Sequence, residues 1–132
     1  MNVKVQFSQM HWGRVLLTGV LVVILVVILN TVLFVLATHI WSQPDQAQVA
    51  IGVSSWSTYI LLLLLTFGGA IWVARTVVID PLLHGVLLGL VVGLVLCILS
   101  MGFGSPVLRA LVTLVLNMAA GYLGGLLGSR GR

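Results

Sequence analysis

Long apolar runs separated by short polar links dominate the chain. This pattern predicts four membrane-spanning helices, at about 15–40, 53–74, 81–100 and 107–127. Each run meets the requirement of roughly 20 apolar residues, because a helix rises 1.5 Å per residue and the hydrocarbon core is about 30 Å thick. We therefore expect an all-α integral membrane protein.

The links between the runs are too short to fold independently. Sequential helices joined by short links lie antiparallel beside one another, which predicts a single membrane domain over 1–132 with an up-down-up-down four-helix bundle. The first run is preceded by basic residues, as in a signal peptide, but it exceeds the 7 to 15 apolar residues of a cleavable segment. We interpret it as a retained first span that tilts or projects beyond the membrane.

The positions of the charged residues predict how the helices are oriented across the membrane. Only 6% of the residues are charged, against about 25% in a soluble domain, and the net charge is +4. With the N-terminus inside, all basic residues except Arg109 lie on the cytoplasmic side: Lys4, Arg14, Arg75, Arg130 and Arg132. Both termini are therefore predicted to be cytoplasmic. The basic residues stand singly at helix ends, so the sequence does not indicate a nucleic-acid partner.

Tryptophans, which favour membrane interfaces, give the same orientation independently. Trp12 and Trp72 mark the cytoplasmic interface, and Trp41 and Trp56 mark the outer one. The two signals agree.

Small and polar residues recur at helical spacing on one face of each predicted helix. Helices in a bilayer associate through close packing and polar contacts, so these faces are predicted to pack against other helices. The predicted packing residues are Gly19, Asn30, Gly69, Gly85, Gly89, Gly93, Thr113, Asn117, Gly121, Gly124, Gly125 and Gly128. The alternative is that the glycines line a passage.

Asn30 and Asn117 are the strongest polar signals, since each amide lies deep in its span and needs a partner in hydrocarbon. Counted at 1.5 Å per residue from the cytoplasmic ends, Asn30 and Thr113 lie at about 22 and 21 Å, and Asn117 at about 15 Å. A contact from Asn30 to Thr113 or Asn117 is therefore geometrically possible. Interhelical adhesion is the favoured role, and lining a pore or ligand pocket is the alternative.

The missing residue types exclude most chemistry. The chain has no glutamate, and neither aspartate lies inside a predicted span, so the acid that coupled transporters use is absent. The histidines fall at different interfaces, and no three metal ligands converge. No catalytic triad, phosphate loop or haem-ligand pair is present. We expect neither an enzyme nor a cofactor or metal site.

The glycine pattern between Gly68 and Arg130, "GGAIWVAR…DPLLHGVLLGLVVGLVL…NMAAGYLGGLLGSR", resembles that of the YrzE-like family. These are small, uncharacterised four-helix bacterial membrane proteins. The resemblance implies four spans and a bacterial cytoplasmic membrane, and it implies no activity. The segment "TLVLNMAAGYLGG" is also similar to the pore helix of small fluoride channels, but it occurs in the last helix and its spacing differs.

Two functions remain from the sequence. The first is a non-enzymatic structural or accessory subunit that packs through glycine-rich helix faces into a homo-oligomer or a larger membrane complex. Its partners would be lipid and other membrane subunits. The alternative is a small passive channel for an anion or neutral solute.

The orientation generates a labelling prediction. Cysteines introduced at Gln46, in the external link, and at Ser129, at the cytoplasmic end, should react with an impermeant thiol reagent from opposite sides of the membrane. Labelling of both from one side would contradict the predicted topology.

Overall fold

The computed structural model describes residues 12–40, 46–102, 104 and 106–130. Four helices make up this part of the chain: α2 (Trp12–Ile40), α3 (Ala47–Thr76), α4 (Pro81–Gly102) and α5 (Val107–Arg130). Each is long and apolar enough to cross a membrane, which confirms the predicted all-α, four-helix architecture. Lys4, Trp41 and Arg132, which entered the topology prediction, lie outside the described residues.

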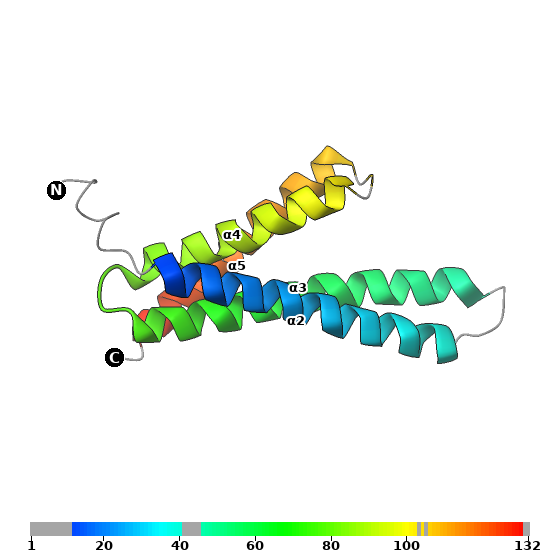
Figure 1. The fold of residues 1–132 in the computed structure, drawn as a ribbon, viewed down its shortest axis with the longest axis horizontal. Helices are drawn as coiled ribbons and strands as arrows, with labels where there is room; N and C mark the ends of the chain where they lie inside the picture. The colour runs from blue at the N-terminus through cyan, green and yellow to red at the C-terminus, as the bar shows by residue number, and fades with distance from the viewer. Residues whose placement is uncertain (1–11, 41–45, 103, 105, 131–132) are drawn as a thin grey trace.

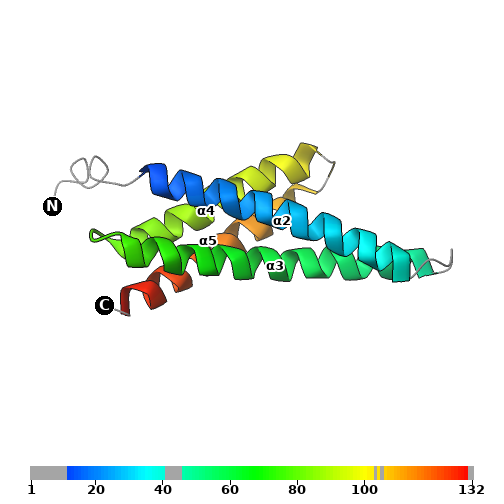
Figure 2. The ribbon, with the colours of Figure 1, turned by 60° about the horizontal axis from the view of Figure 1, so that its bottom comes forward.

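The helices form two antiparallel hairpins, α2 with α3 and α4 with α5 (Figure 1). We call the end that holds Trp12, the α3–α4 link and Arg130 the packed end, because the hairpins lie together there. At the opposite end, the open end, the α4–α5 hairpin turns away from the α2–α3 hairpin, and the second view shows the hairpins crossing (Figure 2). The α2–α3 hairpin also projects farther, since α3 has 30 residues and α4 has 22.

The start of α3 differs from the sequence prediction. The helix begins at Ala47 and not near residue 53. The residues before the apolar run are polar, so the apolar pattern did not predict these first turns, although polar residues also form helices. The hydroxyls of Ser54 and Ser55 both donate to the carbonyl of Ile51, at 2.9 and 2.8 Å, so the helix satisfies them internally.

The last helix is the neighbour of two others. α5 packs against both α4 and α3, while α2 packs against α3 and α4 and makes no contact with α5. α3 and α5 run in the same direction, so the bundle contains a parallel pair beside its antiparallel hairpins (Figure 1).

The apolar core lies toward the packed end and in the middle of the bundle. Two clusters of buried side chains form it: Val15, Ala70, Val73, Val77 and Leu88 in one, and Val22, Val26, Leu62 and Val92 in the other. Small residues bring α2 and α3 close to this core. A Cβ atom added at Gly19 would lie 3.0 Å from Cγ1 of Val91, and one at Gly69 would lie 3.2 Å from Cγ2 of Val22.

Helices α4 and α5 touch backbone to backbone along a glycine seam formed by Gly85, Gly89, Gly121 and Gly125. A Cβ atom added at Gly85 would lie 2.8 Å from Cα of Gly125, and one at Gly89 would lie 2.9 Å from the carbonyl carbon of Asn117. Such distances leave no room for a side chain. The seam continues at Gly93, where the added atom would lie 3.1 Å from Cα of Leu114.

A second pair of glycines on α5 faces α3. A Cβ atom added at Gly124 would lie 2.7 Å from Cβ of Ala70, and one at Gly128 would lie 2.6 Å from Cβ of Ala74. These glycines lie near the end of α5, at the packed end of the bundle. The helix therefore approaches two neighbours closely, with one pair of small residues for each.

The seam predicts opposite effects for two glycine-to-alanine substitutions in helix interiors. Gly89→Ala should destabilise the bundle by about 1–3 kcal/mol, because the added methyl group meets the backbone of α5. Gly68→Ala is the matched control, because Gly68 has nothing within 4 Å and alanine is the better helix former by about 1 kcal/mol. Unfolding of the purified variants in detergent, followed by circular dichroism, measures both. Equal stability of the two variants would contradict the seam.

Candidate functional site

Asn30 and Asn117 are both bound to threonines of α3. The hydroxyl of Thr58 donates to Oδ1 of Asn30, which joins α3 to α2. Thr66 donates to Oδ1 of Asn117 at 2.9 Å, which joins α3 to α5. The depths counted along the helices had made a contact from Asn30 to Thr113 or Asn117 possible. The structure contradicts this contact, because α2 does not touch α5.

Asn117 is fully buried, with none of its surface exposed. Its Nδ2 donates to the carbonyl of Thr113 one turn earlier, at 2.8 Å, so both ends of the amide are bound. An amide without partners in an apolar interior costs several kcal/mol, which explains why α3 supplies a hydroxyl at this depth.

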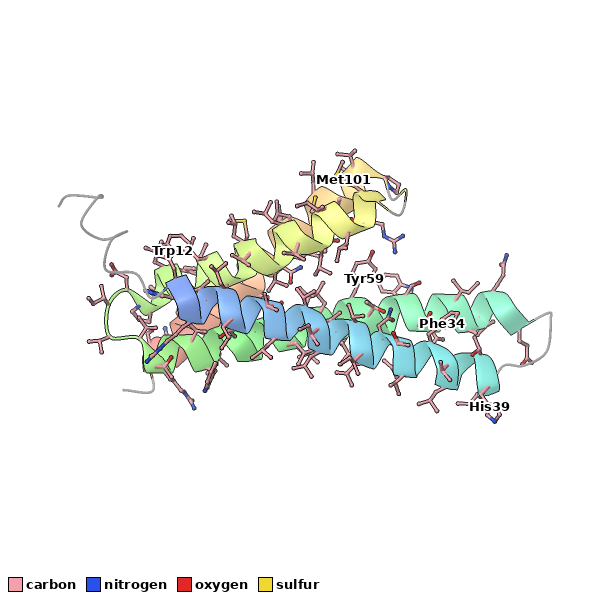
Figure 3. All side chains as sticks on the ribbon, viewed as in Figure 1. Trp12, Phe34, His39, Tyr59 and Met101 are labelled. Carbon is pink, nitrogen blue, oxygen red and sulfur yellow. The ribbon has the colours of Figure 1, made fainter. Side chains whose placement is uncertain are left out.

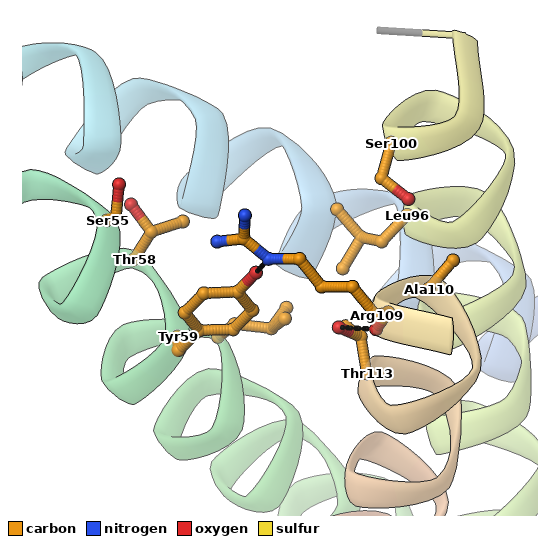
Figure 4. Close-up of a pocket in the computed structure, with 9 residues that line it drawn as sticks. Ser55, Thr58, Tyr59, Leu96, Ser100, Arg109, Ala110 and Thr113 are labelled. Carbon is orange, nitrogen blue, oxygen red and sulfur yellow. Dashed lines mark hydrogen bonds between the residues drawn. The ribbon is translucent and has the colours of Figure 1, made fainter. Parts of the chain in front are cut away.

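A cavity of about 230 Å³ opens between the two hairpins at the open end. We call it the cleft. Its lining comes from three helices: Ser55, Thr58, Tyr59 and Leu62 of α3, Leu96 and Ser100 of α4, and Arg109, Ala110 and Thr113 of α5 (Figure 4). The cleft is more than ten times the 10–15 Å³ that one water molecule needs by the same measure, and it combines hydroxyl groups with one guanidinium.

Arg109 and Tyr59 meet across the cleft. Tyr59 points from α3 into the space between the hairpins (Figure 3). Nε of Arg109 donates to the Tyr59 hydroxyl, and the guanidinium carbon lies 5.2 Å from the centre of the Tyr59 ring. This distance is within the range of a cation–π interaction. The pair fixes the guanidinium in the middle of the cleft, between side chains of α3 and those of α4 (Figure 4).

The terminal nitrogens of Arg109 are directed into the cleft and have no acceptor among the residues that the structure describes. Asp80 is the one acidic residue in that part of the chain, and it lies in the α3–α4 link at the packed end. Arg109 also stands in the first turn of α5, where the helix dipole disfavours a cation. The site therefore carries a positive charge that nothing in the described bundle balances.

Three hydroxyl groups of the cleft donate their protons to the backbone of their own helices. Ser55, Ser100 and Thr113 donate to backbone carbonyls one turn earlier, at 2.8, 3.0 and 2.9 Å. A hydroxyl that donates its proton still has lone pairs to accept with. The walls of the cleft therefore offer acceptor oxygens, and Arg109 offers donors.

An apolar groove of about 580 Å³ runs along the outside of α3 and α5, next to the cleft. Trp56, Ile60, Leu63, Pro106, Leu108, Val112 and Leu116 line it, together with Tyr59, Arg109 and Thr113, which also line the cleft. The Arg109–Tyr59 pair thus lies between a cleft with a mixed polar and apolar lining and a groove that is almost wholly apolar. From Arg109 the groove continues along α5 to Leu116, toward the packed end.

The cleft and the predicted packing residues overlap only at Thr113. The predicted glycines all lie in helix contacts elsewhere in the bundle. Sequence reasoning used Arg109 only for orientation and did not single out Tyr59. The signal that could have pointed to Arg109 is its position as the one basic residue on the predicted outer side, at the unfavourable end of a helix dipole.

Within the described residues, no three His, Cys, Asp or Glu side chains lie close enough together to hold a metal ion. His39 is exposed near the open end of α2, whereas His84 is buried in the first turns of α4, at the packed end. Compared with protein-family models, curated proteins and solved structures, the chain has no significant match.

The Thr66–Asn117 bond predicts a measurable coupling. Thr66→Val and Asn117→Leu each keep the approximate shape of the side chain and remove one partner. A double-mutant cycle should give a coupling of about 0.6 kcal/mol and at most about 1.7, the range for polar contacts between membrane helices. Thermal unfolding of the four proteins in one detergent supplies the cycle. Strict additivity would show that the bond contributes nothing to the α3–α5 contact.

Proposed function

We propose that the chain is a non-enzymatic accessory protein of the bacterial cytoplasmic membrane, inserted with four spans and with both termini in the cytoplasm. The single observation that carries the proposal is the contrast between the two ends of the bundle. One end is held together by glycines and an apolar core, and the other opens into a cleft that holds hydroxyl groups and a cation with no counter-charge among the described residues. A bundle that is closed at one end and open at the other suits binding better than transport or catalysis.

The basic residues support the proposed orientation. Arg14, Arg75 and Arg130 gather at the packed end, whereas Arg109 lies toward the open end. Arg14 donates from Nη1 to the carbonyl of Thr76 at 2.8 Å, which ties the start of α2 to the end of α3. The positive-inside rule then assigns the packed end to the cytoplasm. The resemblance to the YrzE-like family supports the bacterial setting.

The polar groups argue against the channel. Most of them lie in the cleft or reach as far as Thr66 and Asn117, and of the described polar side chains only Thr18 and His84 are buried closer to the packed end. Closer to the packed end, the fully buried Val73, Val77 and Leu88 fill the interior. A passive pore needs polar groups or water along its whole length, and this half of the bundle offers too few.

The contacts of the glycines within the chain limit which surfaces a partner could use. The seam glycines and those that face α3 are in contact within one chain, so they are not free to pack against a second one. A homo-oligomer or a larger complex would therefore use the cleft or the exposed apolar faces.

Flux measurements test the proposal against the channel. Liposomes that contain the wild-type protein or Asn117→Leu should pass fluoride, chloride and glycerol no faster than protein-free liposomes, because the packed half of the bundle has no wet path. Flux through the wild type that the leucine variant loses would establish the channel. Intact-mass measurement of native nanodiscs tests the accessory role: a particle with one 14.1 kDa chain and no further protein would contradict it.

A further inference from the structure

The cleft and the groove form one amphipathic site, because they share Tyr59, Arg109 and Thr113. We propose that this site binds a single anionic glycerophospholipid with a hydroxylated headgroup, of the phosphatidylglycerol type. Its phosphate lies at Arg109, its headgroup in the cleft and one acyl chain in the groove. The inference rests on the membrane insertion proposed above and does not depend on the accessory role.

Charge selects the headgroup. The terminal nitrogens of Arg109 face the cleft without an acceptor among the described residues, and a guanidinium can donate two parallel hydrogen bonds to a phosphate. No described carboxylate lines the cleft, so a choline or ethanolamine ammonium would find no counter-charge there.

The hydroxyl groups add a second selection. Ser55, Ser100 and Thr113 have donated their protons to the backbone and present acceptor oxygens. A headgroup that carries hydroxyl donors, such as glycerol, complements these oxygens, whereas a bare phosphate leaves them without donors.

Depth and direction fit a lipid and not a soluble anion. Tyr59 lies 17 residues before Thr76, the last residue of α3, which is about 26 Å along the helix. Across a hydrocarbon core of about 30 Å, Arg109 then lies near the boundary of the leaflet opposite the packed end, close to the lipid phosphates. From Arg109 the apolar groove runs along α5 to Leu116, toward the bilayer centre, as an acyl chain does.

The groove ends at Leu116, so a tryptophan introduced there allows a direct test, since bromine atoms on an acyl chain quench tryptophan fluorescence on contact. The protein carries Leu116→Trp together with Trp12→Phe, Trp41→Phe, Trp56→Phe and Trp72→Phe, and is reconstituted in phosphatidylcholine with increasing brominated phosphatidylglycerol. We expect phosphatidylglycerol to be favoured about fivefold at the introduced tryptophan, the effect of one arginine near a charged lipid. Arg109→Gln should abolish this preference.

Arg130→Gln is the matched control, because it removes the same charge from the same helix at the packed end. It should keep the fivefold preference. Loss of the preference in both arginine variants would overturn the site in favour of general charge attraction, and retention in Arg109→Gln would overturn it directly.

Three further results would also overturn the inference, in ways that can be told apart. Equal quenching by brominated phosphatidylglycerol and phosphatidylcholine in the wild type would mean that ordinary lipid fills the groove. Displacement of the brominated lipid by millimolar glycerol phosphate would identify a site for a free anion. If neither brominated lipid quenches the introduced tryptophan, the proposed membrane insertion fails together with the site.

Discussion

The contact between the backbones of α4 and α5 is the constraint on which the rest of the bundle depends. In the proposed membrane setting, lipid surrounds the outer faces and competes for every apolar side chain, so burial of leucine against leucine gains little for association. What distinguishes a helix contact from a lipid contact is close approach. Gly85 and Gly121 permit it, because neither helix has a side chain between the two backbones.

The second glycine pair of α5 explains the shape of the molecule. The residues of α5 that meet α3 grow in size from the packed end to the open end: Gly128 and Gly124 first, then Asn117, then Arg109. Helices separated by glycine lie close together, and helices separated by asparagine or arginine stand farther apart. The divergence of the hairpins at the open end therefore follows from this gradient, and the cleft is its product (Figure 1).

The polar contacts follow the same gradient. Where α3 and α5 are close, methyl groups and backbone fill the space. Halfway, one hydroxyl and one amide satisfy each other within it. At the open end the space exceeds what Arg109 and Tyr59 fill together, and the remaining volume is the part of the bundle that suits a ligand. A charge without a counter-charge among the described residues is expensive near hydrocarbon, and for this reason it points to a function.

The sequence alone determined the four helices, because continuous apolar runs of spanning length have one stable form in lipid. It also indicated small-residue faces on each helix, since spacing within a helix is a local property. It missed the first turns of α3, where polar residues interrupt the apolar pattern without interrupting the helix. Only the tertiary structure decided which faces meet. Each helix is apolar nearly all round, so no amphipathic pattern assigns a face to a neighbour. The placement of α5 between α3 and α4, the separation of Asn30 from Asn117 and the meeting of Tyr59 with Arg109 depend on the fit of two backbones, which is a property of pairs of helices and not of either sequence segment.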